Sequence, residues 1–322
     1  MFIQTKNLYK YFDTPSGKLH AVDNINIGMN EGETLGIVGE SGCGKSTLGR
    51  VILRLQEPDS GNIYYDGMDI TKLNDSDMRK MRRYMQIIFQ DPYSSLNPRY
   101  TVSEIISEPL NFFNIYDNHR DKKFRVEELM DIVGLSKRCY NMYPHEFDGG
   151  RRQRIVIARA LSINPKFIVC DEPVSALDVS IQAQIINLLM DLQKSLKLTY
   201  MFISHDLSVV KHISNNISVM YLGEIIESCD KKSLFESPMH PYTKALLSAI
   251  PSMNFNENFS KKDKMKKNIL LKGEISSPIN PKKGCRFYNR CVYAKGYCLN
   301  ENVKLEEVNN NHYVACLRAK EL

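Results

Sequence analysis

A glycine-rich loop near the start of the chain contains the residues best suited to chemistry. It runs in the order Gly39, Glu40, Ser41, Gly42, Cys43, Gly44, Lys45, Ser46 and Thr47. Glycines let a backbone curl so that successive N–H groups point at phosphate oxygens, and a helix that starts in the loop adds a favourable dipole. The pattern predicts a nucleotide site in which Lys45 contacts the β- and γ-phosphates and the Ser46 hydroxyl holds Mg²⁺.

Cys43 lies inside this loop, and two interpretations of it stay open. It is a small spacer, or it is a reactive thiol whose pKa is lowered by the helix N-terminus. We expect the spacer. A chance glycine-rich turn is the corresponding alternative for the whole loop, but an apolar strand before it and a helical pattern after it favour phosphate binding.

Four further polar residues follow three apolar strands. Asp171 and Glu172 come directly after one strand, His205 after a second and Gln90 after a third. Ligands bind at the carboxyl edge of parallel sheets, so these side chains are expected to meet there. Asp171 is predicted to bind Mg²⁺ directly or through water, and Glu172 to polarise the attacking water. His205 is predicted to contact the γ-phosphate, and Gln90 to reach the metal and the water.

Alternating strands and helices would position these groups. Continuous apolar runs predict buried parallel strands at residues 34–38, 85–89, 167–170 and 200–203. Amphipathic patterns predict helices at residues 45–55, 150–161 and 181–196. Residues 91–150 form a helical pattern broken by prolines, which indicates an inserted helical subdomain. The order predicts an α/β layered fold with a mainly parallel sheet.

Composition and charge exclude several classes of protein. Of 322 residues, 43% are hydrophobic and 25% charged, an ordinary globular balance. No apolar run approaches the ~18–20 residues that span a bilayer, and the start lacks the order of a signal peptide. The net charge of +6 is modest, and most basic residues are interleaved with acidic ones, so no nucleic-acid partner is expected. We expect the chain to stay in the cytoplasm and to meet a membrane only through partners.

Three more segments resemble the ABC transporter ATPases. Residues 147–154, with Asp148, Gly149 and Gly150, are similar to that family's signature, Leu-Ser-Gly-Gly-Gln-x-Gln-Arg. Residues 175–178 resemble its D-loop, and Phe12 lies where the family places an aromatic that stacks on adenine. The resemblance implies a P-loop ABC ATPase fold that binds ATP and Mg²⁺. That fold has a mainly parallel core sheet, an antiparallel β subdomain and an inserted helical subdomain at about residues 91–154.

Two segments are similar to the oligopeptide, dipeptide and nickel importer subfamily. They are residues 90–99 and residues 237–243. The resemblance implies an ATPase domain at residues 1–235 and a C-terminal extension at residues 236–322. It also implies that the chain hydrolyses ATP to power peptide import from the cytoplasmic face of the cell membrane. Its expected partners are a second related ATPase, two membrane permeases and, indirectly, an extracytoplasmic peptide-binding protein.

Four of the eight cysteines are concentrated in the tail, at Cys285, Cys291, Cys298 and Cys316. Thiols of a cytosolic chain are normally reduced, so their spacing indicates Cys₄ metal ligation rather than disulfides. Because related importer subunits carry an iron–sulfur cluster here, we expect [4Fe–4S], with Zn²⁺ or four unliganded thiols as the alternatives. Residues 261–267, five of which are lysine, are expected to be a solvated linker rather than a lipid-binding patch.

Asp148 departs from the resemblance. The family's serine donates a hydrogen bond to the γ-phosphate of the opposing chain, whereas an ionised aspartate only accepts. Arg151 also replaces a glutamine and is placed to pair with Asp148. A regulatory subunit with weak hydrolysis therefore remains an alternative. A soluble ABC protein of DNA repair or translation is disfavoured, because no coiled-coil insertion, internal zinc module or second ATPase domain is seen.

Overall fold

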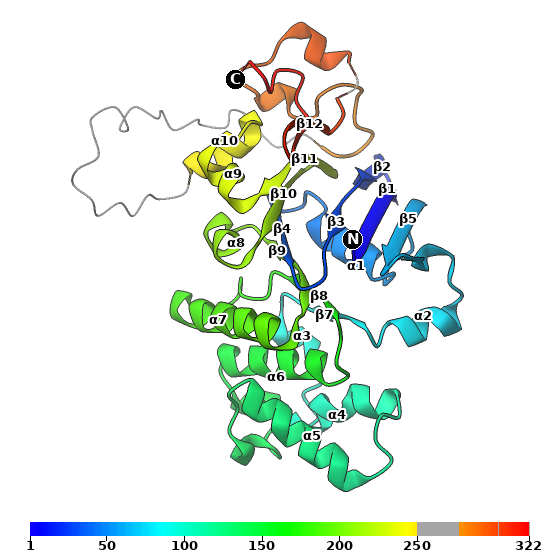
Figure 1. Ribbon diagram of the computed structural model, residues 1–322, viewed down its shortest axis with the longest axis vertical. Helices are drawn as coiled ribbons and strands as arrows, with labels where there is room; N and C mark the ends of the chain where they lie inside the picture. Colours follow the sequence, from blue (N-terminus) through cyan, green and yellow to red (C-terminus); the bar gives the residue numbers. More distant parts are fainter. Residues whose placement is uncertain (250–276, 302, 322) are drawn as a thin grey trace, which may run out of the picture.

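The computed structural model describes residues 1–249, 277–301 and 303–321. Its described residues contain two β-sheets, several helices and a small C-terminal extension (Figure 1). The polar stretch at residues 254–268, with its lysine run, lies outside the described residues.

The core of the larger sheet is parallel, as predicted. Adjacent strands run in the order β10, β4, β9, β8 and β7, and every neighbouring pair among them is parallel. Their bounds are Asn216–Tyr221, Thr34–Val38, Thr199–Ser204, Phe167–Asp171 and Met85–Ile88. Three of them, β4, β8 and β9, are buried along their whole length, which explains why they appear in the sequence as continuous apolar runs.

The smaller sheet is antiparallel, as the resemblance implied, and contains the first strands of the chain. Its order is β2, β1, β5 and β6, with β3 also paired to β1. The bounds are β1 Ile3–Thr14, β2 Gly17–Ile25, β3 Gly28–Met29, β5 Ser60–Tyr65 and β6 Met68–Asp69. Its buried side chains pack with those of the first helix and of the core strands in one apolar cluster, so this sheet is fixed against the phosphate loop.

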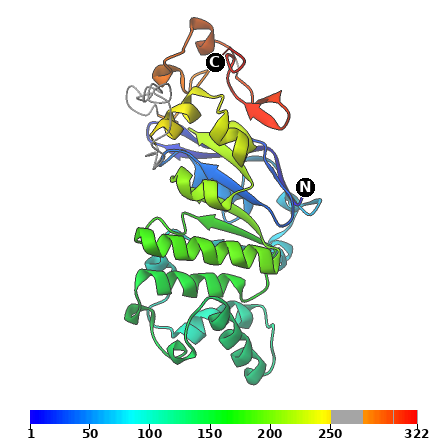
Figure 2. The same ribbon diagram turned by 60° about the vertical axis from the view of Figure 1, so that its left-hand side comes forward.

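Helices cover the core sheet and form a separate group below it in Figures 1 and 2. The α-helices are α1 Lys45–Ile52, α2 Asp75–Met81, α3 Pro92–Ser95, α4 Val102–Phe112, α5 His119–Ile132, α6 Gly149–Leu161, α7 Val179–Leu196, α8 Leu207–Ile213, α9 Lys231–Glu236 and α10 Pro241–Ser248. A capping box of Thr101 and Glu104 starts α4, and this helix packs with α5 and α6. Helix α1 ends three residues earlier than predicted, because Arg54 adopts a left-handed backbone conformation (φ 48°).

The C-terminal extension continues the core sheet, a feature that the sequence pattern did not predict. Strand β11 (Glu224–Asp230) runs antiparallel to β10, followed by β13 (His312–Val314) and β12 (Glu306–Asn309). A buried polar contact, with 2.8 Å between His312 Nε2 and Glu227 Oε1, joins β13 to β11. The extension thus shares a sheet with the phosphate loop.

Candidate nucleotide site

The predicted phosphate loop connects β4 to α1, as phosphate-binding loops require. Gly44, the residue before α1, has φ 106°, and a Cβ there would lie 2.0 Å from the Ala21 carbonyl oxygen. Only glycine fits a backbone that is both left-handed and this closely packed. The loop conformation therefore depends on the glycines that made it recognisable in the sequence.

Lys45 is buried within the loop, and only 4% of its surface is exposed. Its ammonium donates hydrogen bonds to the carbonyl oxygens of Gly39 and Glu40, both at 2.9 Å. An ammonium has three donors. The loop backbone thus orients Lys45 with two of them, and the third is directed at Cys43 Sγ, a weak acceptor 3.9 Å away that an anionic ligand would replace.

Cys43 does not have the low thiol pKa that its position at a helix N-terminus allows. Burial raises the pKa of this side chain, and the nearby Lys45 charge only partly opposes that effect. The interpretation of Cys43 as a small spacer is favoured over that of a reactive thiol.

The side-chain oxygens of Ser46 and Asp171 meet at the base of the loop. The Ser46 hydroxyl donates to Asp171 Oδ1 at 2.6 Å, and Arg50 Nη2 lies 3.9 Å from Asp171 Oδ2. The pKa of Asp171 is raised, because the effect of burial exceeds the opposing effects of the Ser46 hydrogen bond and the Arg50 charge. A hydroxyl and a carboxylate are ligands that Mg²⁺ prefers, and a cation there would offset the cost of burying the carboxylate.

Glu172, Gln90 and His205 converge from three neighbouring strand ends. Gln90 Nε2 donates to Glu172 Oε2 at 3.0 Å, and His205 Nδ1 lies 3.1 Å from the same oxygen. Glu172 has φ 48°, an uncommon conformation for a residue other than glycine that occurs often at functional sites. The predicted acid, amide and imidazole are thus brought together at the carboxyl edge of the sheet.

Phe12 lies on β1, opposite Leu19 of β2, with the Lys10 ammonium 5.5 Å from its ring centre. Beside it, Tyr11 packs on His20 with ring centres 4.3 Å apart. Phe12, the residue predicted to stack on adenine, is partly exposed on the hairpin that β1 and β2 form.

The signature residues lie at the start of α6. Asp148 is the helix cap: its Oδ1 accepts a hydrogen bond from the Arg151 backbone N–H at 2.8 Å, and its other oxygen lies 3.4 Å from Arg151 Nε. Both side chains are 61% exposed. A Cβ on Gly150 would lie 2.6 Å from Ile181, so this glycine permits close packing of α6 on α7. The predicted pairing of Asp148 with Arg151 is present.

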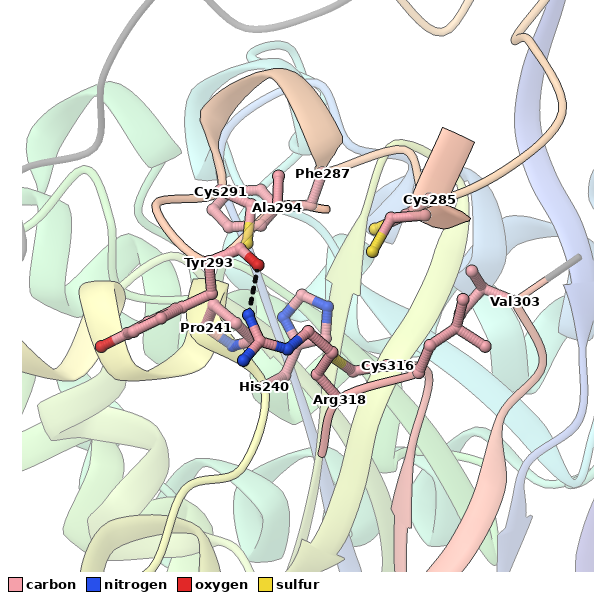
Figure 3. A pocket seen from close by; sticks show the side chains of 12 residues that line it. His240, Pro241, Cys285, Phe287, Cys291, Tyr293, Ala294, Val303, Cys316 and Arg318 are labelled. Carbon is pink, nitrogen blue, oxygen red and sulfur yellow. Dashed lines mark hydrogen bonds between the residues drawn. The ribbon is translucent and has the colours of Figure 1, made fainter. Parts of the chain in front are cut away.

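The four tail cysteines line a single pocket with His240 and Phe287 (Figure 3). Burial raises the pKa of Cys285 to about 12, with contributions from the other three thiols. The described residues nevertheless contain no group of three or more His, Cys, Asp or Glu side chains placed to hold a metal ion. The four thiols line one pocket, and the predicted metal site stays a prediction.

The sequence matches two family models. Residues 22–175 match the ABC transporter family, and residues 226–298 match the oligopeptide/dipeptide transporter C-terminal region. Together with the relatives below, these matches show that the chain belongs to the ABC transporter ATP-binding proteins, in the oligopeptide/dipeptide group. It is an ATPase that uses ATP and Mg²⁺.

The similarity to known proteins extends over almost the whole chain. The oligopeptide transport ATP-binding protein AppF of Bacillus subtilis is 50% identical over 98% of this chain and 96% of its own length. The dipeptide transport ATP-binding protein DppF of Haemophilus influenzae is 46% identical over 96% of this chain and 94% of its own. The dimeric ABC cassette MJ0796, solved with ADP and Pi, has a TM-score of 0.65 at 31% identity, covering 71% of this chain and 98% of that one.

Sequence reasoning missed several residues around the loop. Arg50 faces Asp171, and two residues of the extension, Tyr242 and Arg290, contact Glu40. Tyr242 lies in the segment 237–243 and Arg290 directly before Cys291, but nothing in the local sequence indicates their contact with the loop. Within the described parts of the chain, no helix is long and apolar enough to cross a membrane.

Proposed function

We propose that this ATPase powers the import of oligopeptides or dipeptides. The observation that carries the proposal is full-length similarity to peptide transport ATP-binding proteins, including the C-terminal region that peptide transporters share. The convergence of Gln90, Glu172 and His205 beside the loop supports hydrolysis by the chain itself.

Each site residue has a role that its environment supports. The loop backbone and Lys45 bind the phosphates, and Phe12 stacks on adenine. Ser46 and Asp171, with Gln90, hold Mg²⁺, which neutralises charge on the phosphates. Glu172 orients the attacking water as general base, positioned by Gln90 and His205. His205 also contacts the γ-phosphate.

The chain works in a head-to-tail pair with a second, related ATPase on the cytoplasmic face of the membrane. In this arrangement Asp148, Gly149 and Gly150 face the nucleotide on the partner's loop, and the partner's signature completes the site of Lys45. The exposed position of Asp148 at a helix N-terminus supports such an intermolecular role. Residues 1–235 form the ATPase domain, with its helical subdomain at about 91–154, and residues 236–322 form the extension.

Reconstitution tests this function. The chain, its partner ATPase and two permeases are placed in liposomes with a peptide-binding protein, and uptake of labelled peptide is followed. ATP-dependent uptake that requires this chain is the expected result. Nickel uptake without peptide uptake would move the chain to the nickel importers, and ATPase activity that no permease or solute affects would argue against a transport role.

A weakly hydrolysing regulatory subunit is the second candidate, and Asp148 is the observation that favours it. Turnover of the chain alone and with its partner separates the two. A pair whose activity is unaffected by loss of Glu172 would identify this chain as regulatory.

We further propose that Cys285, Cys291, Cys298 and Cys316 hold a [4Fe–4S] cluster that stabilises the extension, with Zn²⁺ as the alternative. Thiolates are the usual ligands of such clusters, and these four side chains line one pocket. Four thiolates also suit a single zinc ion, about 2.3 Å from each sulfur, so the metal content has to separate the two.

Metal analysis of anaerobically purified protein tests this site. We expect about four iron atoms per chain and a brown colour. Cys291→Ser should lose the iron, whereas the matched control Cys139→Ser, outside the pocket, should keep it. Stoichiometric zinc without iron would replace the cluster with a zinc site, and protein without either metal would refute both.

A further inference from the structure

An arginine of the C-terminal extension reaches the phosphate loop. Arg290 lies between Cys285 and Cys291 and is only 7% exposed. Its two terminal nitrogens donate to the two carboxylate oxygens of Glu40, at 2.7 and 2.9 Å. Glu40 is the second residue of the loop, 250 positions away in sequence. A bidentate pair of this kind, here partly buried, is strong and geometrically specific.

The extension holds the backbone of Glu40 as well. The Tyr242 hydroxyl on α10 accepts a hydrogen bond from the Glu40 backbone N–H at 2.9 Å. The rings of Tyr242 and Phe287 pack together with centres 5.5 Å apart, and Tyr221 lies against Tyr242 at 4.7 Å. The guanidinium of Arg290 lies 5.9 Å from the Tyr221 ring centre. Aromatic packing thus fixes both groups that hold Glu40.

Glu40 connects these contacts to Lys45. The Glu40 carbonyl oxygen accepts one of the two loop hydrogen bonds of the Lys45 ammonium, at 2.9 Å. A rotation of the Glu40 peptide would move this acceptor and the ammonium with it. The side chain of Glu40 is held by Arg290, its N–H by Tyr242, and its carbonyl oxygen holds Lys45.

We propose that Arg290 is a positioning residue for ATP binding, acting through Glu40 on the conformation of the phosphate loop and on the direction of Lys45. The extension then does more than attach to the ATPase: it sets the affinity of the nucleotide site. This step rests on the nucleotide-binding role of Lys45, and it does not depend on the identity of the solute.

The alternative is that Arg290 only docks the extension, and two sets of variants separate these roles. Arg290→Met keeps much of the length and apolar packing of the stem but removes the charge. Arg290→Lys keeps the charge but cannot form both parallel hydrogen bonds. His312→Gln weakens a different docking contact, the buried pair with Glu227, which is not part of the phosphate loop.

Binding of MgATP to the full chain is measured first, with thermal unfolding in parallel. We expect Arg290→Met to weaken ATP binding about tenfold or more, since charge-assisted hydrogen bonds contribute on this scale. Arg290→Lys should recover part of the affinity. His312→Gln should lower the unfolding temperature with little change in affinity. With the partner ATPase present, Arg290→Met should raise KM while kcat at saturation changes about twofold or less.

Wild-type binding of MgATP separates failure of this inference from failure of the nucleotide site itself. If wild-type protein binds ATP and Arg290→Met binds it equally well, Arg290 has no positioning role. If Arg290→Met and His312→Gln lose affinity in proportion to their loss of stability, the role is docking alone. In a double-mutant cycle with Glu40→Gln, additive losses of affinity would also overturn the proposal.

Discussion

The phosphate-loop side and the signature side of this ATPase are built differently. On the first, Lys45, Ser46 and Asp171 are held by contacts from the loop, the core sheet and one another. On the second, Asp148 is an exposed helix cap whose carboxylate is paired with Arg151 of the same helix turn. One side is organised within the chain. The other presents a surface whose ligand would come from another chain.

This difference decides where a substitution can be tolerated. A buried carboxylate such as Asp171 is costly to leave without partners, so the first side allows little change. Asp148 caps its helix about as well as the usual serine would, so the fold does not penalise the replacement. We therefore expect losses of function from changes on the phosphate-loop side and a gain of function from a change on the signature side.

The largest effect is expected for Lys45→Ala. This change removes the cation that faces the β- and γ-phosphates, and tight ATP binding should be lost. The affinity of the full chain for MgATP, measured in a direct binding assay, tests this prediction. Lys80→Ala is the matched control, because Lys80 is exposed and pairs with Asp77 on the surface helix α2. Equal affinity of Lys45→Ala and wild type would remove Lys45 from the site.

Glu172→Gln is expected to leave ATP binding intact and to slow hydrolysis at least ~10²-fold, as loss of a general base typically does. The ATP-bound pair with its partner should then accumulate. Single-turnover hydrolysis with the partner present measures the chemical step, and Glu128→Gln, an exposed glutamate paired with Arg125, serves as control. Wild-type turnover of the pair carrying Glu172→Gln would show that Glu172 is not the general base of that turnover, which is also the result expected if this chain is regulatory and the partner's site hydrolyses the ATP.

The sequence predicted the phosphate-loop side well because its signals are local. Glycines at fixed spacing, apolar runs and the polar residues that end them all report on neighbours in the chain. The core strands Thr34–Val38 and Phe167–Asp171 accordingly appear within one residue of the predicted bounds. The convergence of Gln90 and His205 on Glu172 followed from the rule that strand ends meet at one edge.

Contacts between distant segments could not be predicted in the same way. The extension adds strands to the core sheet through β11, yet β12 and β13 are short and only partly buried, so they carry little periodic pattern. The pair of Arg290 with Glu40 spans 250 positions and leaves no local trace. Burial likewise decides the Cys43 pKa, against the effect expected from its place at a helix N-terminus.

The smallest effect, and the one opposite in sign, is expected for Asp148→Ser. Serine retains the cap of α6, so stability should change little. It also removes a negative charge that would face a phosphate and restores a hydrogen-bond donor. Alone, the chain can form only a pair with two such weakened signatures, and we expect its ATPase activity to be low. The serine variant should raise that activity, by a smaller factor than the one lost in Glu172→Gln.

Asp148→Asn separates the two contributions to this gain. Asparagine caps a helix, carries no charge and offers an amide donor in a different position from a hydroxyl. If charge repulsion is the main cost, both variants should raise the turnover of the chain alone to a similar extent. If the serine hydroxyl is needed, only Asp148→Ser should do so. With a partner of normal signature, the site of Lys45 and Glu172 is completed by the partner, so neither variant should alter turnover at that site. Vigorous turnover of wild-type chain alone, or no gain from the serine variant, would show that Asp148 does not weaken the site it faces.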